Sequence, residues 1–373
     1  MQAEATPSFE TSSQFRNWLY TEEVLGQIHA ARRRHALTAL QRGGNLQPSA
    51  FACGASHAGA GACPSADAEP SDDAAKQSLH TEEEHAVLRR YKQLLLQFCR
   101  GFAAPDKVLA TAQSFFSRFF LSNSVIVYDP EKIMLGSLLL AAKVEEVKSI
   151  TAHKIAQKIK TKDSKGEGKV EARRVVESEM LLLVGLRFQL LVWHPFSPLL
   201  GLTVAWDQHH ASTRVAGGGA DAGVAQGGDA TCAYPQGDTL RAVRRDAHTN
   251  VTHAVMHDDC CFLFSPADIA VAALSEAVAA HAPGAENGFW LFIQERFCAA
   301  GNVEALDALR ARTRRIIERL RSVADRLNGA GQDAEHQKQK KAVKRMKKLA
   351  AWRQSGGSGT GTTPPKKKAR KAS

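Results

Sequence analysis

Two charged side chains could do chemistry because each interrupts an apolar stretch. Lys143 is the first charged residue after 133–142, a run in which every residue is apolar or small. Glu179 lies on an apolar stripe at helical spacing within 171–188. An ionised carboxylate on such a stripe costs free energy unless a cation or a donor pairs with it. The stripe consists of Ala172, Val175, Val176, Leu182, Leu183 and Leu186.

The chemistry that this pair offers is hydrogen bonding. A lysine supplies three N–H donors and a glutamate two acceptor oxygens, so the two side chains can bond to each other and to an incoming backbone together. The pattern leaves two interpretations open. Lys143 and Glu179 either form an intramolecular salt bridge that closes the core, or they face an apolar patch made for a partner.

No arrangement typical of catalysis or metal binding accompanies the pair. His253 and His257 are four residues apart, but no acidic residue completes an HExxH arrangement and no third ligand is evident. The seven cysteines are an odd number without a CxxC pair, which indicates reduced intracellular thiols. A Gly-rich phosphate loop and a nucleophile elbow are both missing from the sequence. It therefore predicts a non-catalytic binding subunit with no metal and no cofactor.

The charge distribution separates a neutral body from a basic tail. Residues 333–373 hold 13 Lys and Arg against 2 Asp and Glu, whereas residues 1–332 hold 36 of each. Direct nucleic-acid binding is therefore not expected of the body, although the tail could contact nucleic acid or a membrane surface. With no run of 18 apolar residues and no basic-then-apolar start, the chain is expected to be soluble and unsecreted.

The helix that carries Lys143 begins on local chemistry. Asp129 suits the N-cap position and Pro130 the first helical position. Its unbroken apolar character predicts that other helices surround it. Helical patterns begin at the capping box of Thr81 and Glu84 and at Pro105, and a short helix is expected near 151–160. Five helices in about 110 residues, with no strand pattern, predict an all-α repeat.

The second half repeats the first. Ser265 and Pro266 precede an apolar run in the same way as Asp129 and Pro130, and removal of a low-complexity insertion leaves a period near 105 residues. His209 and His210 would lie in that flexible insertion, solvated. The predicted division is an N-terminal segment and helix (1–42), a low-complexity insertion (43–79), a first repeat (80–192), a second repeat (193–327, with a disordered insertion at 207–237) and a basic tail (328–373).

Several motifs resemble one family. The segment that contains Phe115-Phe116-Ser-Arg118-Phe119-Phe120, then Lys143-Val-Glu-Glu, then Glu179-x-Leu-Leu-Leu, is similar to the first repeat of the cyclins. Within that family the chain most resembles the H-type cyclins, which are regulatory subunits of the CDK-activating kinase and of the transcription and repair factor TFIIH. The features specific to that branch are Ser12-Ser13-Gln14 followed by Trp18, Asn123-Ser124-Val, and Trp193-His194-Pro195-Phe.

The resemblance implies a fold of two tandem five-helix cyclin boxes with flanking N- and C-terminal helices. It also implies that Lys143 and Glu179 hydrogen-bond a cyclin-dependent kinase around its regulatory helix. The function implied is activation of a kinase that phosphorylates CDK activation loops and the RNA polymerase II C-terminal domain, with a third assembly factor and TFIIH as further partners. The implied apolar pocket for the kinase helix is formed by Leu140, Val144, Leu183, Phe188 and Leu190.

A nuclear location is also implied, and the basic cluster of the tail resembles a monopartite nuclear localisation signal. Two alternatives remain. A cyclin C type of the Mediator kinase module shares the His-Pro-Phe element, but the extension past Leu327 argues against it. A DNA-gripping factor of the TFIIB type would have basic repeats and an N-terminal zinc ribbon, neither of which is present here. The cluster consists of Lys366, Lys367, Lys368, Arg370 and Lys371.

Overall fold

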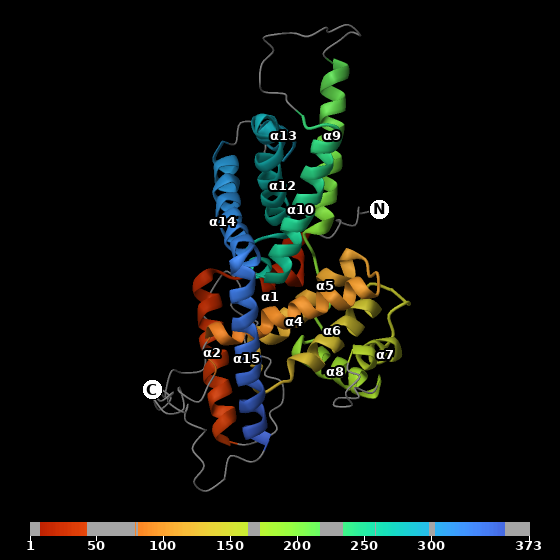
Figure 1. Cartoon of the computed structure of the whole chain (residues 1–373). Coiled ribbons are helices and arrows are strands. Elements are labelled where there is room, and N and C mark those ends of the chain that lie inside the picture. The colour runs from red at the N-terminus through yellow and green to blue at the C-terminus, as the bar shows by residue number, and fades with distance from the viewer. Residues whose placement is uncertain are drawn as a thin grey trace, which may run out of the picture.

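The computed structural model consists of helices. It describes residues 8–42, 79, 81–162, 172–216, 234–257, 259–297 and 303–354, and within these ranges there is no strand. The prediction of an all-α fold is confirmed. None of the described helices is long and apolar enough to cross a membrane. Figure 1 shows two groups of helices, one above the other, which correspond to the two predicted repeats.

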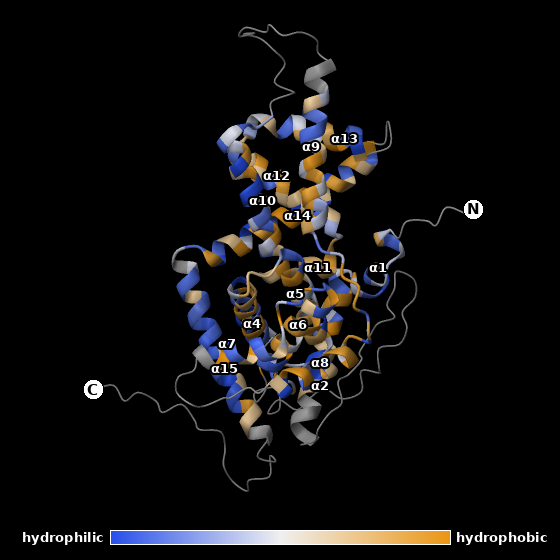
Figure 2. Cartoon of the chain, turned by 90° about the vertical axis from the view of Figure 1, so that its right-hand side faces the viewer, coloured by the Kyte–Doolittle hydropathy of each residue, from blue (hydrophilic) through white to orange (hydrophobic). Residues whose placement is uncertain are grey.

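The first repeat has the five helices that the sequence predicts, and α6 is at its centre. Eleven of the fifteen residues of α6 are buried, and the helix packs against α4, α5, α7 and α8. Asp129 caps α6 by accepting a hydrogen bond from the Glu131 N–H at 3.0 Å, and Pro130 occupies the first turn. Apolar residues gather around α6 in Figure 2. The helices are α4 (Thr81–Gly101), α5 (Asp106–Ser122), α6 (Pro130–Val144), α7 (Ala152–Lys162) and α8 (Ala172–Gly185).

A glycine brings α6 and α8 close together. A methyl group at Gly136 would lie 2.8 Å from the Ser178 Oγ and 2.9 Å from the Ser178 carbonyl carbon. Because one of these atoms belongs to the backbone, rotation of a side chain cannot relieve the overlap. The close approach places the end of α6 beside the middle of α8, where Lys143 and Glu179 lie.

We expect Gly136→Ala to lower the free energy of unfolding by about 1–3 kcal/mol, because overpacking at a tight helix contact forces the two helices apart. Urea denaturation followed by circular dichroism measures the loss. Gly26→Ala in α2 is the matched control, since nothing lies within 4 Å of its added methyl group. That change should leave stability equal or raise it by up to about 1 kcal/mol through helix propensity. Equal losses in both variants would contradict the assignment of Gly136 as the close contact.

The second repeat is built around α12, which begins as α6 does. Ser265 Oγ accepts a hydrogen bond from the Asp268 N–H at 3.1 Å, and Pro266 occupies the first turn. Phe289 and Phe292 of α13 are fully buried in its core. The helices are α9 (Phe196–Ala216), α10 (Gly237–His257), a short α11 (Cys260–Leu263), α12 (Pro266–His281), α13 (Glu286–Phe297) and α14 (Val303–Leu327).

The insertion predicted at 207–237 begins later than expected. Helix α9 continues through 207–216, and only 217–233 lie outside the described residues. Asp207 explains the difference, because its carboxylate accepts hydrogen bonds from the Tyr234 hydroxyl and the Arg244 guanidinium. The expectation that His209 and His210 are solvated in a loop was also wrong. They lie on α9, where His209 Nε2 is 2.9 Å from a Glu295 carboxylate oxygen.

The N-terminal segment is fastened to the connection between the repeats. It comprises a short 3-10 helix η1 (Phe9–Thr11), α1 (Ser13–Trp18) and α2 (Glu22–Arg42). The Gln14 side chain accepts from the Trp193 N–H at 2.6 Å and donates to the Trp193 carbonyl at 2.9 Å. The Trp18 indole N–H donates to the Gln189 side chain at 2.7 Å. Two of the three motifs that suggested the H-type resemblance therefore contact each other.

Helix α2 is joined to α4 by a buried ion pair. The Arg32 Nη2 lies 3.1 Å from a Glu84 carboxylate oxygen, and both residues are buried. The sequence analysis placed Glu84 in a capping box with Thr81. The helix does begin at Thr81, but the Glu84 side chain has other partners. The Glu84 carboxylate is used for the ion pair and for the Ser124 hydroxyl, which donates to it at 2.5 Å.

The basic tail begins with a helix, as predicted. Helix α15 (Ala330–Gln354) follows α14 and packs across α4 of the first repeat (Figure 1). Ala342 and Met346 are buried on the face that meets the first core. The helix is held to α4 by ion pairs, in which Arg89 meets Glu335 at 2.7 Å and Arg345 meets Glu83 at 2.6 Å.

Candidate protein-docking site

The structure brings Lys143 and Glu179 together. Lys143 is in the last turn of α6, and its Nζ lies 2.7 Å from both carboxylate oxygens of Glu179 on α8. The Glu179 side chain is 6% exposed, whereas the Lys143 side chain is 58% exposed. The buried carboxylate of Glu179 is therefore paired with an ammonium group that solvent can reach. Both interpretations of the sequence are compatible with this geometry, because the pair closes the core and still presents N–H donors to solvent.

An exposed apolar surface lies on α8 beside the pair. Val176, Met180 and Val184 are 44%, 58% and 45% exposed. Their spacing of four residues places them on one face of the helix. We call these three residues the α8 stripe. A continuous row of large apolar side chains left in solvent is typical of a surface that another protein covers.

The turn after α8 extends this surface. Arg187 and Phe188 both have positive φ, at 51° and 58°, a conformation that costs free energy for residues other than glycine. The turn is held by backbone hydrogen bonds, including one from the Phe188 N–H to the Leu183 carbonyl at 3.1 Å. It leaves the Phe188 ring 66% exposed, and Leu191 that follows is 53% exposed. The strained turn thus presents an aromatic ring outward at the end of the α8 stripe.

The predicted pocket residues occupy different depths. Leu140 is buried in the first core, so only its neighbours can offer surface to a partner. Leu183 and Leu190 are half-buried and pack against that core. Val144 is 37% exposed at the end of α6, and Phe188 is the most exposed of the five. The five residues therefore range from fully buried to largely exposed.

The sequence analysis missed part of this surface. It placed Val176 on the apolar stripe that includes Val175, but Val175 is buried, whereas Val176 is exposed. It did not select Met180, Val184 or Leu191. The four-residue spacing of 176, 180 and 184 could have indicated a second apolar stripe. It was missed because the sequence analysis assigned a single apolar stripe to this helix. Two apolar faces on one helix indicate two contacts, one with the core and one with a partner.

The described residues contain one cluster with metal-ligating side chains. His29, His85 and Asp259 place one donor atom each within 4.8 Å of one another, and burial lowers the pKa of His29 to about 4. That spread exceeds the distance of about 3.4 Å between ligands of a tetrahedral zinc ion. The cationic Arg32 also lines the small cavity beside them. The geometry fits a contact between helices better than a metal site.

Other predicted features have structural positions as well. His253 is half-buried on α10, while the side chain of His257 lies outside the described residues. The short helix expected near 151–160 is α7, in which the Lys158 Nζ lies 4.0 Å from the centre of the Phe102 ring. The cluster expected to be a nuclear localisation signal, within 366–371, lies outside the described residues.

Comparison with known proteins identifies the domain that carries the site. The family model described as "Cyclin, N-terminal domain" matches residues 67–191, which include Lys143, Glu179 and the α8 stripe. The chain contains a cyclin N-terminal domain. The predicted resemblance to the cyclins is therefore confirmed, and the five helices α4 to α8 are its cyclin box.

Relatives and a solved structure agree with this domain. The chain is 29% identical to cyclin-H of Xenopus laevis over 53% of each chain. It is also 29% identical to cyclin-H1-1 of Arabidopsis thaliana, over 52% of this chain and 54% of that one. The match therefore spans about half the length of these curated relatives. A chain of the CAK complex from Chaetomium thermophilum bound to ATP-gamma-S shares the fold, with a TM-score of 0.62 and 19% identity over 95% and 96% of the two chains.

Proposed function

We propose that this cyclin-domain protein is the regulatory subunit of a cyclin-dependent kinase of the CDK-activating or TFIIH type. The observation that carries the proposal is the exposed ammonium of Lys143, held by buried Glu179 beside the apolar α8 stripe. Such a surface offers directional donors next to area that gains free energy on burial. The similarity to H-type cyclins supports the kinase type.

The proposed role is non-catalytic. Kinase activity requires an ion pair between a strand lysine and the glutamate of the kinase's regulatory helix. A partner that binds only the inward position of that helix shifts the kinase toward its active state. Lys143 and Glu179 would bond to the backbone around the helix, and Phe188 with Val144 would receive its apolar side chains. The free energy of binding would thereby stabilise the active conformation of the kinase.

The substrates in this proposal are CDK activation loops and the RNA polymerase II C-terminal domain. A third assembly factor and TFIIH are proposed as further partners, and the nucleus as the location. Attachment of residues 355–373 to a fluorescent protein tests the location directly. Nuclear accumulation that is lost when Lys366, Lys367 and Lys368 are changed to alanine would support the role of the basic cluster, whereas accumulation that is unchanged would refute it.

The central experiment is recovery of the kinase. The purified full chain is used to capture partners from a lysate, and the captured material is assayed on two substrates. One is a peptide of the polymerase C-terminal repeat, and the other is a cyclin-dependent kinase with an unphosphorylated activation loop. Activity on both substrates is the expected result. Activity on the polymerase peptide alone would favour the cyclin C type, and recovery of DNA without a kinase would favour the TFIIB type and overturn the proposal.

A further inference from the structure

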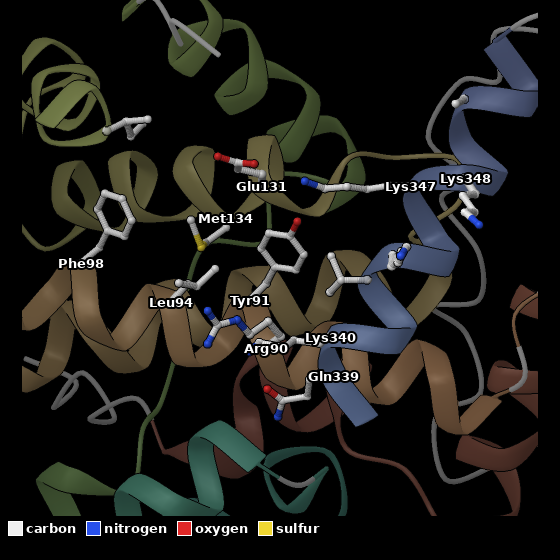
Figure 3. A pocket seen from close by; sticks show the side chains of 14 residues that line it. Arg90, Tyr91, Leu94, Phe98, Glu131, Met134, Gln339, Lys340, Lys347 and Lys348 are labelled. Carbon is white, nitrogen blue, oxygen red and sulfur yellow. The ribbon is translucent and has the colours of Figure 1, made fainter. Parts of the chain in front are cut away.

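A second surface lies on another part of the first repeat, in the groove between α15 and the core. The groove has a volume of about 740 Å³ and is lined by residues of α4, α6, α7 and α15. Its floor is apolar and its lining residues include none of the docking-site residues described above. Figure 3 shows Tyr91, Leu94 and Phe98 of α4 and Met134 of α6 directed into one space that α15 borders.

The sides of the groove are strongly basic. Lys340, Lys344, Lys347 and Lys348 of α15 are exposed, and Arg90 of α4 lines the same groove. Glu131 is the single carboxylate among the lining residues that the structure describes. Lys340, Lys344 and Lys348 recur every four residues, and Lys347 lies three residues after Lys344, so the lysines extend along about 12 Å of the helix.

These lysines differ from the other cations of α15. Lys338 lies 3.0 Å from Glu82, and Arg345 pairs with Glu83, so both hold α15 on α4. Within the described ranges, no ion pair neutralises Arg90 or the four lysines of the row. The helix therefore uses one set of cations for its own attachment. The second set concentrates positive potential over an apolar floor, where a ligand of opposite charge gains most.

We propose that this groove binds an acidic segment of a partner protein that carries one or two large apolar side chains. The row of lysines matches carboxylates spaced along two helical turns or a few extended residues, and the floor receives the apolar anchors. A helix or strand that places apolar anchors in such a groove is a common mode of peptide recognition. The tail of the same chain does not fit this description, because residues 355–373 hold five Lys and Arg and no carboxylate.

The floor argues against nucleic acid as the ligand. Polyanions bind through phosphate contacts and aromatic stacking, and affinity then depends on charge and on planar surfaces. Here the half-buried Leu94 and Val343 contribute aliphatic surface, which complements an apolar side chain better than a base. The Tyr91 ring is buried in the first core and offers no free face for stacking.

The test uses a fluorescent peptide of about ten residues in which Glu and Asp flank one Leu and one Phe. Fluorescence polarisation on the full chain is expected to show saturable binding that weakens as salt rises. Lys344→Glu with Lys347→Glu should weaken binding at least about tenfold, since like charges placed opposite a ligand are repulsive. Lys341→Glu is the matched control, because Lys341 is exposed on α15 and does not line the groove. It should change affinity less than about twofold.

Two further binding measurements distinguish the proposed recognition from non-specific electrostatic attraction. A peptide with Leu and Phe replaced by Ser should bind at least about tenfold more weakly, as expected when apolar anchors are lost. Equal binding of that peptide, or equal losses for Lys341→Glu and the double variant, would overturn the proposal. Tighter binding of a single-stranded RNA than of the peptide would overturn it as well. Capture of the kinase by the double variant should be unchanged, so the two proposals fail independently.

Discussion

Lys143→Ala and Glu179→Ala are each expected to weaken kinase binding by about 30-fold or more. Truncation of one member of a hydrogen-bonded interface charge pair typically costs about 2–5 kcal/mol, and each 1.4 kcal/mol is a factor of about ten. In Lys143→Ala the carboxylate of Glu179 would remain buried without its cation. In Glu179→Ala the ammonium would lose the group that orients it. Calorimetry with the kinase recovered by the full chain measures both losses, and phosphorylation of the polymerase repeat peptide should fall with them.

Two further variants separate a lost interface from a damaged fold. Lys132→Ala changes another exposed lysine of α6 and should leave kinase affinity within about twofold. Met180→Glu places a charge in the exposed α8 stripe, where the folded monomer tolerates it because the side chain is 58% exposed. It should weaken kinase binding without lowering the melting temperature. Normal affinity and full kinase activation in Lys143→Ala would refute the role assigned to that residue.

The site was predictable from sequence where local chemistry and burial act together. Asp129 and Pro130 start α6 through bonds within a few residues, and the apolar run after them requires burial on all sides. A single charge in each apolar pattern then indicated that Lys143 and Glu179 meet. Their distance of 2.7 Å follows from the packing of α6 on α8 at Gly136, a contact that no local pattern specifies.

The features of the fold and the site that were not predicted depend on which helix covers which face of its neighbour. Periodicity identifies apolar positions, but it does not show that Val175 meets the core while Val176 meets solvent. The same limit applies to α15, which was predicted as a C-terminal helix but without the surface on which it packs. Its burial of Met346 against the first repeat, and the groove beside that contact, depend on partners from α4 that are more than 200 residues earlier in the chain.

The buried pair of Arg32 and Glu84 is the clearest case of a contact that sequence patterns cannot show. Glu84 has an ordinary local explanation as part of a capping box, and Arg32 is the first of three consecutive arginines. The structure instead places them 3.1 Å apart and only 3% and 5% exposed at their side chains. Arg32 Nη1 also donates to the Phe120 carbonyl at 2.7 Å, so one guanidinium joins α2, α4 and α5.

Arg32→Ala is therefore expected to lower the free energy of unfolding by about 3–5 kcal/mol. Removal of one partner leaves a buried charge without compensation, and that penalty exceeds the value of most single contacts. Among the described residues, the Glu84 carboxylate would keep the Ser124 hydroxyl as its donor, and the Phe120 carbonyl would lose the Arg32 donor. Chemical denaturation with two probes, far-ultraviolet circular dichroism and tryptophan fluorescence, measures the change and tests whether the chain unfolds in one step.

Arg33→Ala is the control, because the neighbouring side chain is only half-buried and should cost less than about 1 kcal/mol. The double variant Arg32→Leu with Glu84→Leu separates a charge penalty from lost packing. Since it removes both charges, it should recover more than half of the loss seen in Arg32→Ala. A double variant as unstable as the single one would show that the Phe120 and Ser124 hydrogen bonds, and not the unpaired carboxylate, account for the cost. That result would show that Arg32 stabilises the fold through its hydrogen bond to the Phe120 carbonyl of α5, and not through its charge.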